Sequence, residues 1–385
     1  MAFQKIERMR PLHMVDLKSQ YEKIKDIVLP AIHEVLETNT YINGPKVHQF
    51  QRELEAYMGV KHVIPCANGT DALQIAMMGL GLQPGDEVIT ADFTFAATVE
   101  VIALLQLTPV LVDVDLVSMN ISIEAIKKAI TPKTKAIVPV HLFGRAANME
   151  AIMAIANEHQ LFVIEDNAQA IGAYCRFSDG SKRQAGTIGH VGATSFFPSK
   201  NLGCYGDGGA IFTNDDALAH TLRGIVNHGM YERYHHDVVG VNSRLDSVQA
   251  AVLSAKLPHL NEYNAARQNA ARAYSVAFDN HPHVVAPTIC SVCDCHVFHQ
   301  YTLRITNGQR DALMAHLQSK GIPCAIYYPI PLHRQKAYLD ARYLESDFPV
   351  TNLLSEQVLS LPMHTELDPE QIDFITQTIL HFFNS

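Results

Sequence analysis

A single lysine, Lys200, stands between a short apolar run at 194–197 and a loop dense in glycine, at positions 203, 206, 208 and 209. A protonated amine is a poor nucleophile, but a partly dry pocket disfavours the ammonium form and lets the amine form a Schiff base with a carbonyl group. A lysine considered alone is more often an ordinary solvated side chain. Lys200 is therefore a candidate nucleophile whose assignment depends on the rest of the chain.

The turn 67–70 precedes a predicted helix and is suited to binding a phosphate group. Gly69 lets backbone amides approach an anion, Thr70 offers a hydroxyl group, and the N-terminus of the helix that begins near Asp71 favours negative charge. Threonine and aspartate are also preferred at helix N-caps, so these residues could serve the helix alone. The motif by itself leaves both interpretations open.

Two acids and an amide follow another predicted strand, in the order Glu165, Asp166 and Gln169. One of the carboxylates could face a ring nitrogen, and Gln169, one helical turn further, could bond a second group of the same ligand. The same residues could instead begin a capped helix. The pattern alone is compatible with both.

Four further residues carry groups that could contact a ligand. Ser195 lies five residues before Lys200, Phe95 follows a predicted strand, and Asn242 and Arg244 precede an amphipathic helix. Phenylalanine commonly packs in a core and arginine commonly pairs with a surface acid, so each also has an ordinary explanation.

Together these residues match the requirements of one cofactor, pyridoxal 5'-phosphate (PLP). A PLP site needs a lysine that forms a Schiff base, an acid that keeps the pyridine nitrogen protonated, a cup for the phosphate and an aromatic ring stacked on the pyridine. The candidates, in that order, are Lys200, the Glu165–Asp166 pair, the Gly69–Thr70 turn with Ser195, and Phe95. Each motif is weak alone, and the ordered set predicts a PLP enzyme.

The elements that must position these residues alternate between strands and helices. Short apolar segments predict strands at 87–90, 110–114, 136–142, 161–164, 193–197 and 210–213. Helical patterns occur at 17–36, 71–80, 97–105, 123–130, 149–159 and 217–226. The segment 41–60 has a turn at 43–45 followed by a helical pattern through positions 47, 50, 54 and 58. This order predicts an α/β fold with a mostly parallel sheet covered on both faces. Ligands of such sheets bind beyond the carboxyl ends of the strands, where the candidate motifs fall.

The pattern changes after residue 242. Two long helices are predicted at 245–257 and 260–278, followed by strands near 299–305 and 324–328 and helices at 311–320, 354–359 and 369–382. We therefore expect a large PLP-binding domain, residues 1–258, and a smaller C-terminal α+β domain, residues 259–385. The N-terminal segment of the first could pack on the second.

Length, charge and cysteine content narrow the classes of function. The 385 residues allow two domains, and a net charge of -9 without a basic block argues against a nucleic-acid partner. No apolar run approaches the roughly 20 residues of a membrane span, and no signal peptide is visible, so we expect a cytoplasmic protein. Seven cysteines indicate reduced thiols. The compact group Cys290, Cys293, Cys295 and His296 lacks a second pair, and we expect no metal site.

Several longer motifs run through nearly the whole chain. They are Val15-Asp16-Leu17, Ile42-Asn43-Gly44-Pro45, 68–73, 84–89, 165–166, 195–209, 242–246, Tyr328-Pro329-Ile330-Pro331-Leu332-His333 and Leu361-Pro362-Met363-His364. These motifs resemble the DegT/DnrJ/EryC1/StrS family of PLP-dependent sugar aminotransferases. The resemblance implies fold type I, the aspartate aminotransferase-like fold.

For the reacting groups, the resemblance implies that Lys200 binds PLP covalently, Asp166 partners the pyridine nitrogen, and Gln169 lies beside the 3-hydroxyl group. L-glutamate would give up its amino group and leave as 2-oxoglutarate, after which a keto sugar would accept the group in the same pocket. Ping-pong kinetics would follow.

For the rest of the site, Gly69, Thr70 and Ser195 would correspond to phosphate ligands and Phe95 to the stacked ring. Asn242 would correspond to a residue that reaches the PLP phosphate of the neighbouring subunit. The resemblance thus implies a homodimer with shared active sites.

Within the family, residues 196–209 and 234–236 are similar to those of enzymes that aminate C3 of nucleotide-linked 3-keto sugars, including those that make 2,3-diamino-uronic acids on UDP. In these, Arg244 would bind the substrate, with Tyr327 and Tyr328 beside it, and the product would serve surface polysaccharides such as lipopolysaccharide O-antigen. A histidine is usual where Tyr327 stands, which leaves the sugar open. The alternatives are a C4-keto or dTDP-linked sugar and, from another class, a non-catalytic sensor that binds PLP or a sugar nucleotide.

Overall fold

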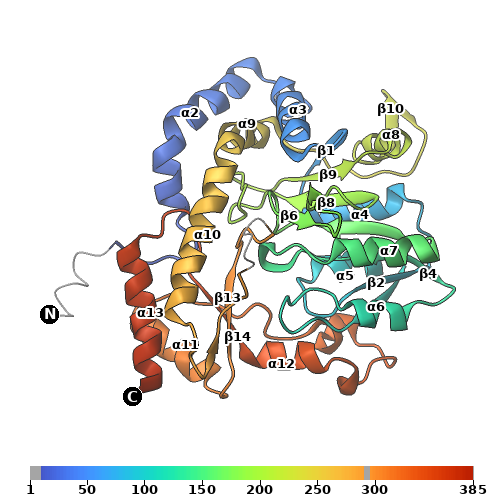
Figure 1. Ribbon diagram of the computed structural model, residues 1–385. Helices are drawn as coiled ribbons and strands as arrows, with labels where there is room; N and C mark the ends of the chain where they lie inside the picture. The colour runs from blue at the N-terminus through green and yellow to red at the C-terminus, as the bar shows by residue number, and fades with distance from the viewer. Residues whose placement is uncertain (1–9, 290–294, 385) are drawn as a thin grey trace.

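The computed structural model describes residues 10–289 and 295–384, and its centre is a seven-stranded sheet in the order β1-β9-β8-β5-β4-β2-β3 (Figure 1). The strands are β1 His62–Cys66, β2 Glu87–Ala91, β3 Thr108–Val112, β4 Thr134–Val138, β5 Phe162–Asp166, β8 Val191–Ser195 and β9 Gly209–Thr213. Only β9 runs antiparallel to both of its neighbours. The predicted α/β fold with a mostly parallel sheet is therefore confirmed.

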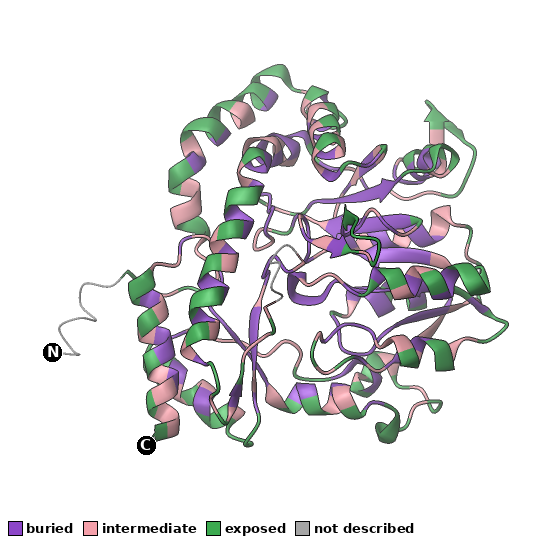
Figure 2. Ribbon diagram, viewed as in Figure 1, coloured by how far each residue is buried: buried purple, intermediate pink, exposed green. Residues whose placement is uncertain are grey.

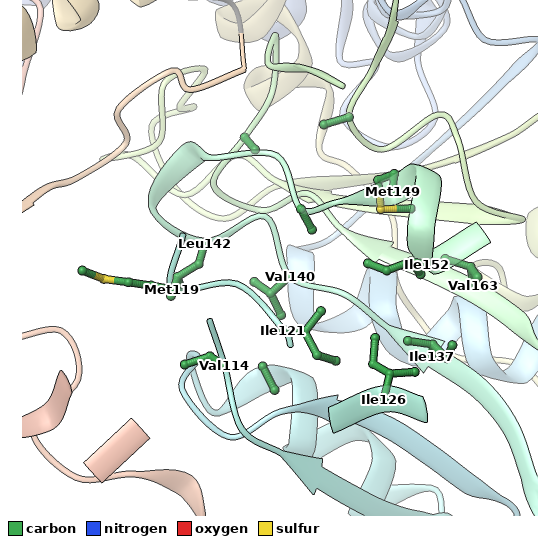
Figure 3. Packing of buried hydrophobic residues seen from close by; sticks show 14 of the residues in the cluster. Val114, Met119, Ile121, Ile126, Ile137, Val140, Leu142, Met149, Ile152 and Val163 are labelled. Atoms are coloured by element: carbon green, nitrogen blue, oxygen red, sulfur yellow. The ribbon is translucent and has the colours of Figure 1, made fainter. Parts of the chain in front are cut away.

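Helices cover both faces of this sheet. They are α4 Gly69–Gly79, α5 Ala97–Leu104, α6 Ile123–Ala129, α7 Met149–His159 and α8 Asp216–Ile225. Alternate strand residues enter two cores: Ile137 and Val163 pack with α6 and α7 on one face (Figure 3), while Val138 and Ile164 pack with α4, α5 and α8 on the other. Figure 2 shows buried strands between helices whose outer faces are exposed. Full burial of each such aliphatic side chain contributes about 1.5–3 kcal/mol.

Two N-terminal helices lie beside the main sheet, and both pack against a third helix. The carboxylate of Asp16 caps α2 (Leu17–Thr38) by accepting a hydrogen bond from Ser19 N at 2.9 Å. A turn then leads to α3 (Pro45–Met58), and both helices pack on α9 (Ser247–Lys256) (Figure 1).

The C-terminal part surrounds a smaller sheet of three strands, β12 Val284–Val285, β13 Tyr301–Ile305 and β14 Val358–Leu361. Its helices are α10 Leu260–Ala277, α11 Arg310–Ser319, α12 Pro349–Gln357 and α13 Pro369–Asn384. The N-terminal segment joins this part: Leu12 packs on its core, Met363 N donates to Met14 O at 3.1 Å, and Arg10 bonds Asp368, 358 positions away, at 2.9 Å.

Three sequence predictions differ from the structure. The region 324–328 is no strand; it makes one bridge, from Ala325 to Ser360, and continues as irregular backbone toward Pro329. The helix predicted at 354–359 is α12, which begins earlier, and residues 358–361 form β14 because they pair with β13. Strand β1 was not among the predicted strands. It contains Pro65, which is unusual in a central strand, but β1 lies at the sheet edge, where proline is tolerated.

The remaining elements are short. Two hairpins extend from the main sheet, β6 Tyr174–Arg176 with β7 Lys182–Gln184, and β10 Met230–Glu232 with β11 His235–His236. Within residues 10–289 and 295–384, no helix combines the length and the apolar character that crossing a bilayer requires.

Candidate active site

A pocket of about 810 Å³ lies beyond the carboxyl ends of the central strands. The strand register explains how distant motifs meet there. Asp166 pairs with Ala193 near the end of β8, and Ser195 ends β8. Gly209 pairs with both Ser195 and Cys66, which lies three residues before the start of α4. Most of the predicted site residues line the pocket, and only two do not. Those that line it are Gly69, Thr70, Phe95, Asp166, Gln169, Ser195, Lys200, Tyr327 and Tyr328.

Lys200 lies in the loop after β8. A turn in which Lys200 N donates to Phe197 O at 2.8 Å brings its side chain to the pocket wall. Burial lowers the pKa of Lys200 to about 8, and the nearby carboxylate of Asp166 acts in the opposite direction. The amine is thus much easier to deprotonate than that of a solvated lysine.

Asp166 is the last residue of β5, and its side chain is only 6% exposed. Thr98 Oγ1 donates to its Oδ2 at 2.8 Å, and Ala168 N donates to its Oδ1 at 3.1 Å. Burial raises the pKa of Asp166, while the bonds from Thr98 and Ala168 and the charge of Lys200 lower it. An ionised carboxylate has about four acceptor sites, so Asp166 can still accept a bond from a ligand N–H.

Glu165 lies on the opposite side of β5, because successive strand residues point to opposite faces. Its buried carboxylate accepts hydrogen bonds from the backbone N–H groups of Gly186 at 2.7 Å and of Ile188 and Gly189 at 2.6 Å. It also contacts His141 Nε2 at 2.9 Å. Of the two acids that the sequence left open, Asp166 is therefore the one that lines the pocket.

The start of α4 forms a narrow cradle against the end of β8. Asn68 Oδ1 accepts from Asp71 N at 2.8 Å and caps the helix. A Cβ atom on Gly69 would lie 2.7 Å from Ser195 Cβ, so only glycine fits at this position. Thr70 and Ser195 both line the pocket here, and their hydroxyl groups at a helix N-terminus suit an anion.

Aromatic rings form the opposite wall. Phe95 is 58% exposed, and its ring centroid lies 6.3 Å from that of Tyr328, which stacks on Phe143 at 6.5 Å. Gln169 makes hydrogen bonds to two residues of this wall. Its Oε1 accepts from Phe143 N at 2.6 Å, and its Nε2 donates to Tyr328 Oη at 3.2 Å. The exposed phenyl face gives a flat apolar ligand a surface to stack on.

Asn242 and Arg244 are not among the described residues that line the pocket. Asn242 is exposed and forms a backbone bridge with Asn227, whose Oδ1 accepts from Arg244 Nη1 at 3.3 Å. One chain therefore does not bring these two residues to Lys200.

The structure adds residues that the sequence did not indicate. Thr98 and Phe143 are such residues, and so is His299, a pocket residue only 5% exposed whose Nδ1 has no hydrogen-bond partner within the described part of the chain. Each follows an ordinary helix, strand or loop pattern, so no local signal distinguishes it. Of the cysteine group, Cys290 and Cys293 lie outside the described residues.

The residues present fit PLP. The pocket combines a half-buried lysine whose amine has a lowered pKa, a buried carboxylate with free acceptor sites, a cradle that a Cβ atom would fill at a helix N-terminus, and an open aromatic face. An α/β sheet that carries these groups at its strand ends defines a PLP-dependent transferase of fold type I.

Comparison with known proteins specifies the family. The DegT/DnrJ/EryC1/StrS aminotransferase family matches residues 22–380, and the chain belongs to this family. It is a PLP-dependent aminotransferase.

Three curated relatives illustrate its members. The chain is 47% identical to the UDP-2-acetamido-2-deoxy-3-oxo-D-glucuronate aminotransferase of Pseudomonas aeruginosa, over 94% of this chain and 98% of that protein. It is 45% identical to the UDP-N-acetyl-3-dehydro-alpha-D-glucosamine 3-aminotransferase of Acidithiobacillus ferrooxidans, over 95% and 96% of the two chains. It is also 44% identical to a pleiotropic regulatory protein of Geobacillus stearothermophilus, over 96% and 98%.

Solved structures agree. A DegT/DnrJ/EryC1/StrS aminotransferase from Brucella abortus superposes with a TM-score of 0.90 at 44% identity, covering 97% of this chain and all of that one. NtdA from Bacillus subtilis, with bound PMP (pyridoxamine phosphate), gives 0.88 at 29% identity, covering 98% and 86%.

Proposed function

We propose that this enzyme transfers the amino group of L-glutamate to C3 of a UDP-linked 3-keto sugar or 3-keto uronate. The observation that carries the proposal is the placement of Lys200 and the buried Asp166 in one pocket that also has an open aromatic wall. The named activities of the two UDP-sugar relatives support the acceptor. A relative from Streptomyces venezuelae named for a dTDP-linked sugar is less similar, at 39% identity.

In this proposal, Asp166 and Lys200 each have a separate role in the reaction. PLP, when bound, supplies a ring that accepts negative charge from the carbon bearing the amino group. Asp166 holds a proton on the ring nitrogen, because a buried anion stabilises the adjacent cation. Lys200 Nζ takes the proton from Cα of glutamate and returns a proton when the acceptor is aminated, which its lowered pKa favours.

The remaining pocket residues bind and orient. Gly69, Thr70 and Ser195 hold the phosphate at the N-terminus of α4. Phe95 would stack on the ring, and Gln169 would lie beside its 3-hydroxyl group. Tyr327 and Tyr328, which also line the pocket, would contact the sugar.

We propose further that two copies share their active sites. Asn242 and Arg244 lie outside the pocket of their own chain, and Asn242 is exposed, as a residue that serves a neighbouring pocket would be. Asn242 would reach the partner's phosphate group, and the guanidinium of Arg244 would bind the carboxylate of glutamate or of a uronate. The product would enter amino-sugar synthesis for surface polysaccharides such as O-antigen, in the cytoplasm.

Absorbance spectroscopy tests the donor half of this reaction. The purified enzyme should show a visible cofactor band that L-glutamate converts to a near-ultraviolet band, and Lys200→Ala should lack the initial band. Reduction with borohydride followed by peptide mapping should place the cofactor on Lys200. Lys256 is the matched control, because burial also lowers its pKa to about 8, but its Nζ donates to Gly203 O at 2.7 Å.

A panel of UDP- and dTDP-linked 3-keto and 4-keto sugars then tests the acceptor. Restoration of the visible band by a UDP-linked 3-keto sugar alone would support the proposal, and restoration by a 4-keto or dTDP-linked sugar would replace it. A cofactor band that glutamate leaves unchanged would refute glutamate as the amino donor.

A further inference from the structure

Two loops from opposite ends of the sequence meet behind the aromatic wall of the pocket. The first, residues 92–95, follows β2 and carries Phe95; we call it the Phe95 loop. The second, residues 326–333, belongs to the C-terminal part and carries Tyr327 and Tyr328; we call it the Tyr328 segment. Both loops contribute side chains to the pocket.

Three hydrogen bonds to Asp92 join these loops, two from His333 and one from Leu332. The backbone N–H of His333 donates to Asp92 Oδ1 at 2.8 Å, and the imidazole Nδ1 lies 2.6 Å from Asp92 Oδ2. Leu332 N also donates to Asp92 O at 3.3 Å. Burial raises the pKa of Asp92, while the bonds and charge of His333 act in the opposite direction; with the carboxylate ionised, it has only acceptors and the proton of the 2.6 Å bond lies on Nδ1.

The contact is buried and packed. Asp92 is 0% and His333 6% exposed, and Phe348 stacks on the imidazole with ring centroids 4.4 Å apart. Leu332 and Phe348 also belong to a small apolar cluster with Val99 and Leu111 of the main sheet and its helices. Charge-assisted hydrogen bonds in such dry surroundings are stronger than those at a surface.

The second imidazole nitrogen of His333, Nε2, makes no comparable hydrogen bond. Nε2 lies 3.5 Å from Glu345 Oε2 without hydrogen-bond geometry, and Glu345 forms an exposed ion pair with Arg334. Exposed ion pairs contribute little. The inner bond of Nδ1, together with the two backbone bonds to Asp92, therefore joins the two loops, and the outer contact of Nε2 contributes little.

We propose that His333 is a positioning residue that holds the Phe95 loop against the Tyr328 segment and so sets the orientation of the aromatic wall toward cofactor and acceptor. Phe95 lies three residues after Asp92, Tyr328 lies five residues before His333, and their ring centroids are 6.3 Å apart. The proposal deepens the proposed function, in which Phe95 stacks on the PLP ring.

Two amide substitutions distinguish the hydrogen bond of Nδ1 from the contact of Nε2. In His333→Asn the amide nitrogen takes the place of Nδ1 and keeps the bond to Asp92, whereas in His333→Gln it takes the place of Nε2 and loses it. Glu345→Gln is the control for the exposed side. We expect His333→Gln to diminish the visible circular dichroism of bound PLP and to raise KM for the acceptor about tenfold, the effect of one lost hydrogen bond of moderate strength. His333→Asn and Glu345→Gln should remain close to the wild type.

Hydrogen exchange of the apoprotein gives a readout without cofactor. Amides of the two loops should exchange faster in His333→Gln than in His333→Asn, while the amides of α7, which is remote from the contact, stay unchanged. The proposal is overturned if both amide variants behave alike, or if His333→Gln leaves dichroism, KM and loop exchange at wild-type values. If the wild type accepts no amino group on any keto sugar, the proposed acceptor fails, and the dichroism and exchange comparison still decides the role of His333.

Discussion

Replacing Gly69 by alanine should weaken PLP binding through a steric clash that the structure locates. The new Cβ atom would lie 2.7 Å from Ser195 Cβ and 3.2 Å from Ser195 Cα. Ser195 cannot retreat easily, because it ends β8 and pairs with Gly209 on β9. Either the start of α4 or the end of β8 must move, and overpacking of this kind costs about 1–3 kcal/mol of folding stability.

The movement also separates the two halves of the phosphate cradle. If the hydroxyl group of Ser195 loses its bond to a charged phosphate, the loss is about 1.5–3 kcal/mol. Because 1.4 kcal/mol corresponds to a factor of ten, the dissociation constant of PLP should rise about tenfold to a hundredfold. Titration of the apoprotein with PLP, followed by fluorescence, measures this change.

Gly79→Ala is the matched control. Its Cβ atom would lie 2.6 Å from Leu222 Cδ2, so it brings a comparable clash to the other end of the same helix, remote from the pocket. Both variants should lose stability in thermal unfolding, and only Gly69→Ala should lose affinity for PLP. Wild-type affinity in Gly69→Ala, or an equal loss in both variants, would refute the reasoning.

Three further predictions concern ionisable groups. Thr98→Val removes a bond that lowers the pKa of Asp166, so that pKa should rise and the acid limb of the rate profile with glutamate should move to higher pH; an unmoved limb would contradict this. Since burial lowers the pKa of Lys200 to about 8, its labelling by acetic anhydride in the apoprotein should increase as the pH rises through 8, and a midpoint near 10.5 would show a solvated amine. Glu165→Gln turns an amide N–H toward backbone donors and should reduce the free energy of unfolding by about 1–3 kcal/mol in urea titrations; an unchanged midpoint would mean that the buried carboxylate is not needed.

The sequence predicted those helices and strands in which buried apolar residues and exposed polar residues alternate with a regular period. Helix α7 was expected at 149–159 and occupies Met149–His159, because its apolar residues repeat with the helical period. The segment 358–361 forms a strand only because β13 offers an edge, and the proline of β1 obscures another strand. Such pairings depend on distant residues, which no window of sequence contains.

The same distinction applies to the site. Motifs that carry several functional residues in succession, such as the stretch around Lys200, could be found from the sequence. Thr98 could not, because its bond to Asp166 joins residues 68 positions apart and a threonine in a helix carries no mark of its partner.

The contacts between the N-terminal segment and the C-terminal part affect how the protein folds during synthesis. Residues 10–14 bond partners near residue 363 and Asp368, 358 positions after Arg10, so these bonds cannot form until almost the whole described chain has left the ribosome. Helix α2 likewise waits for α9 before Ile24 and Val28 can be covered. Contacts of such long range slow folding and leave apolar surface open to aggregation in the meantime. The nascent chain should therefore depend on chaperones that shield its N-terminal helix, and PLP, whose pocket needs Tyr328 as well as Gly69, should bind only after release.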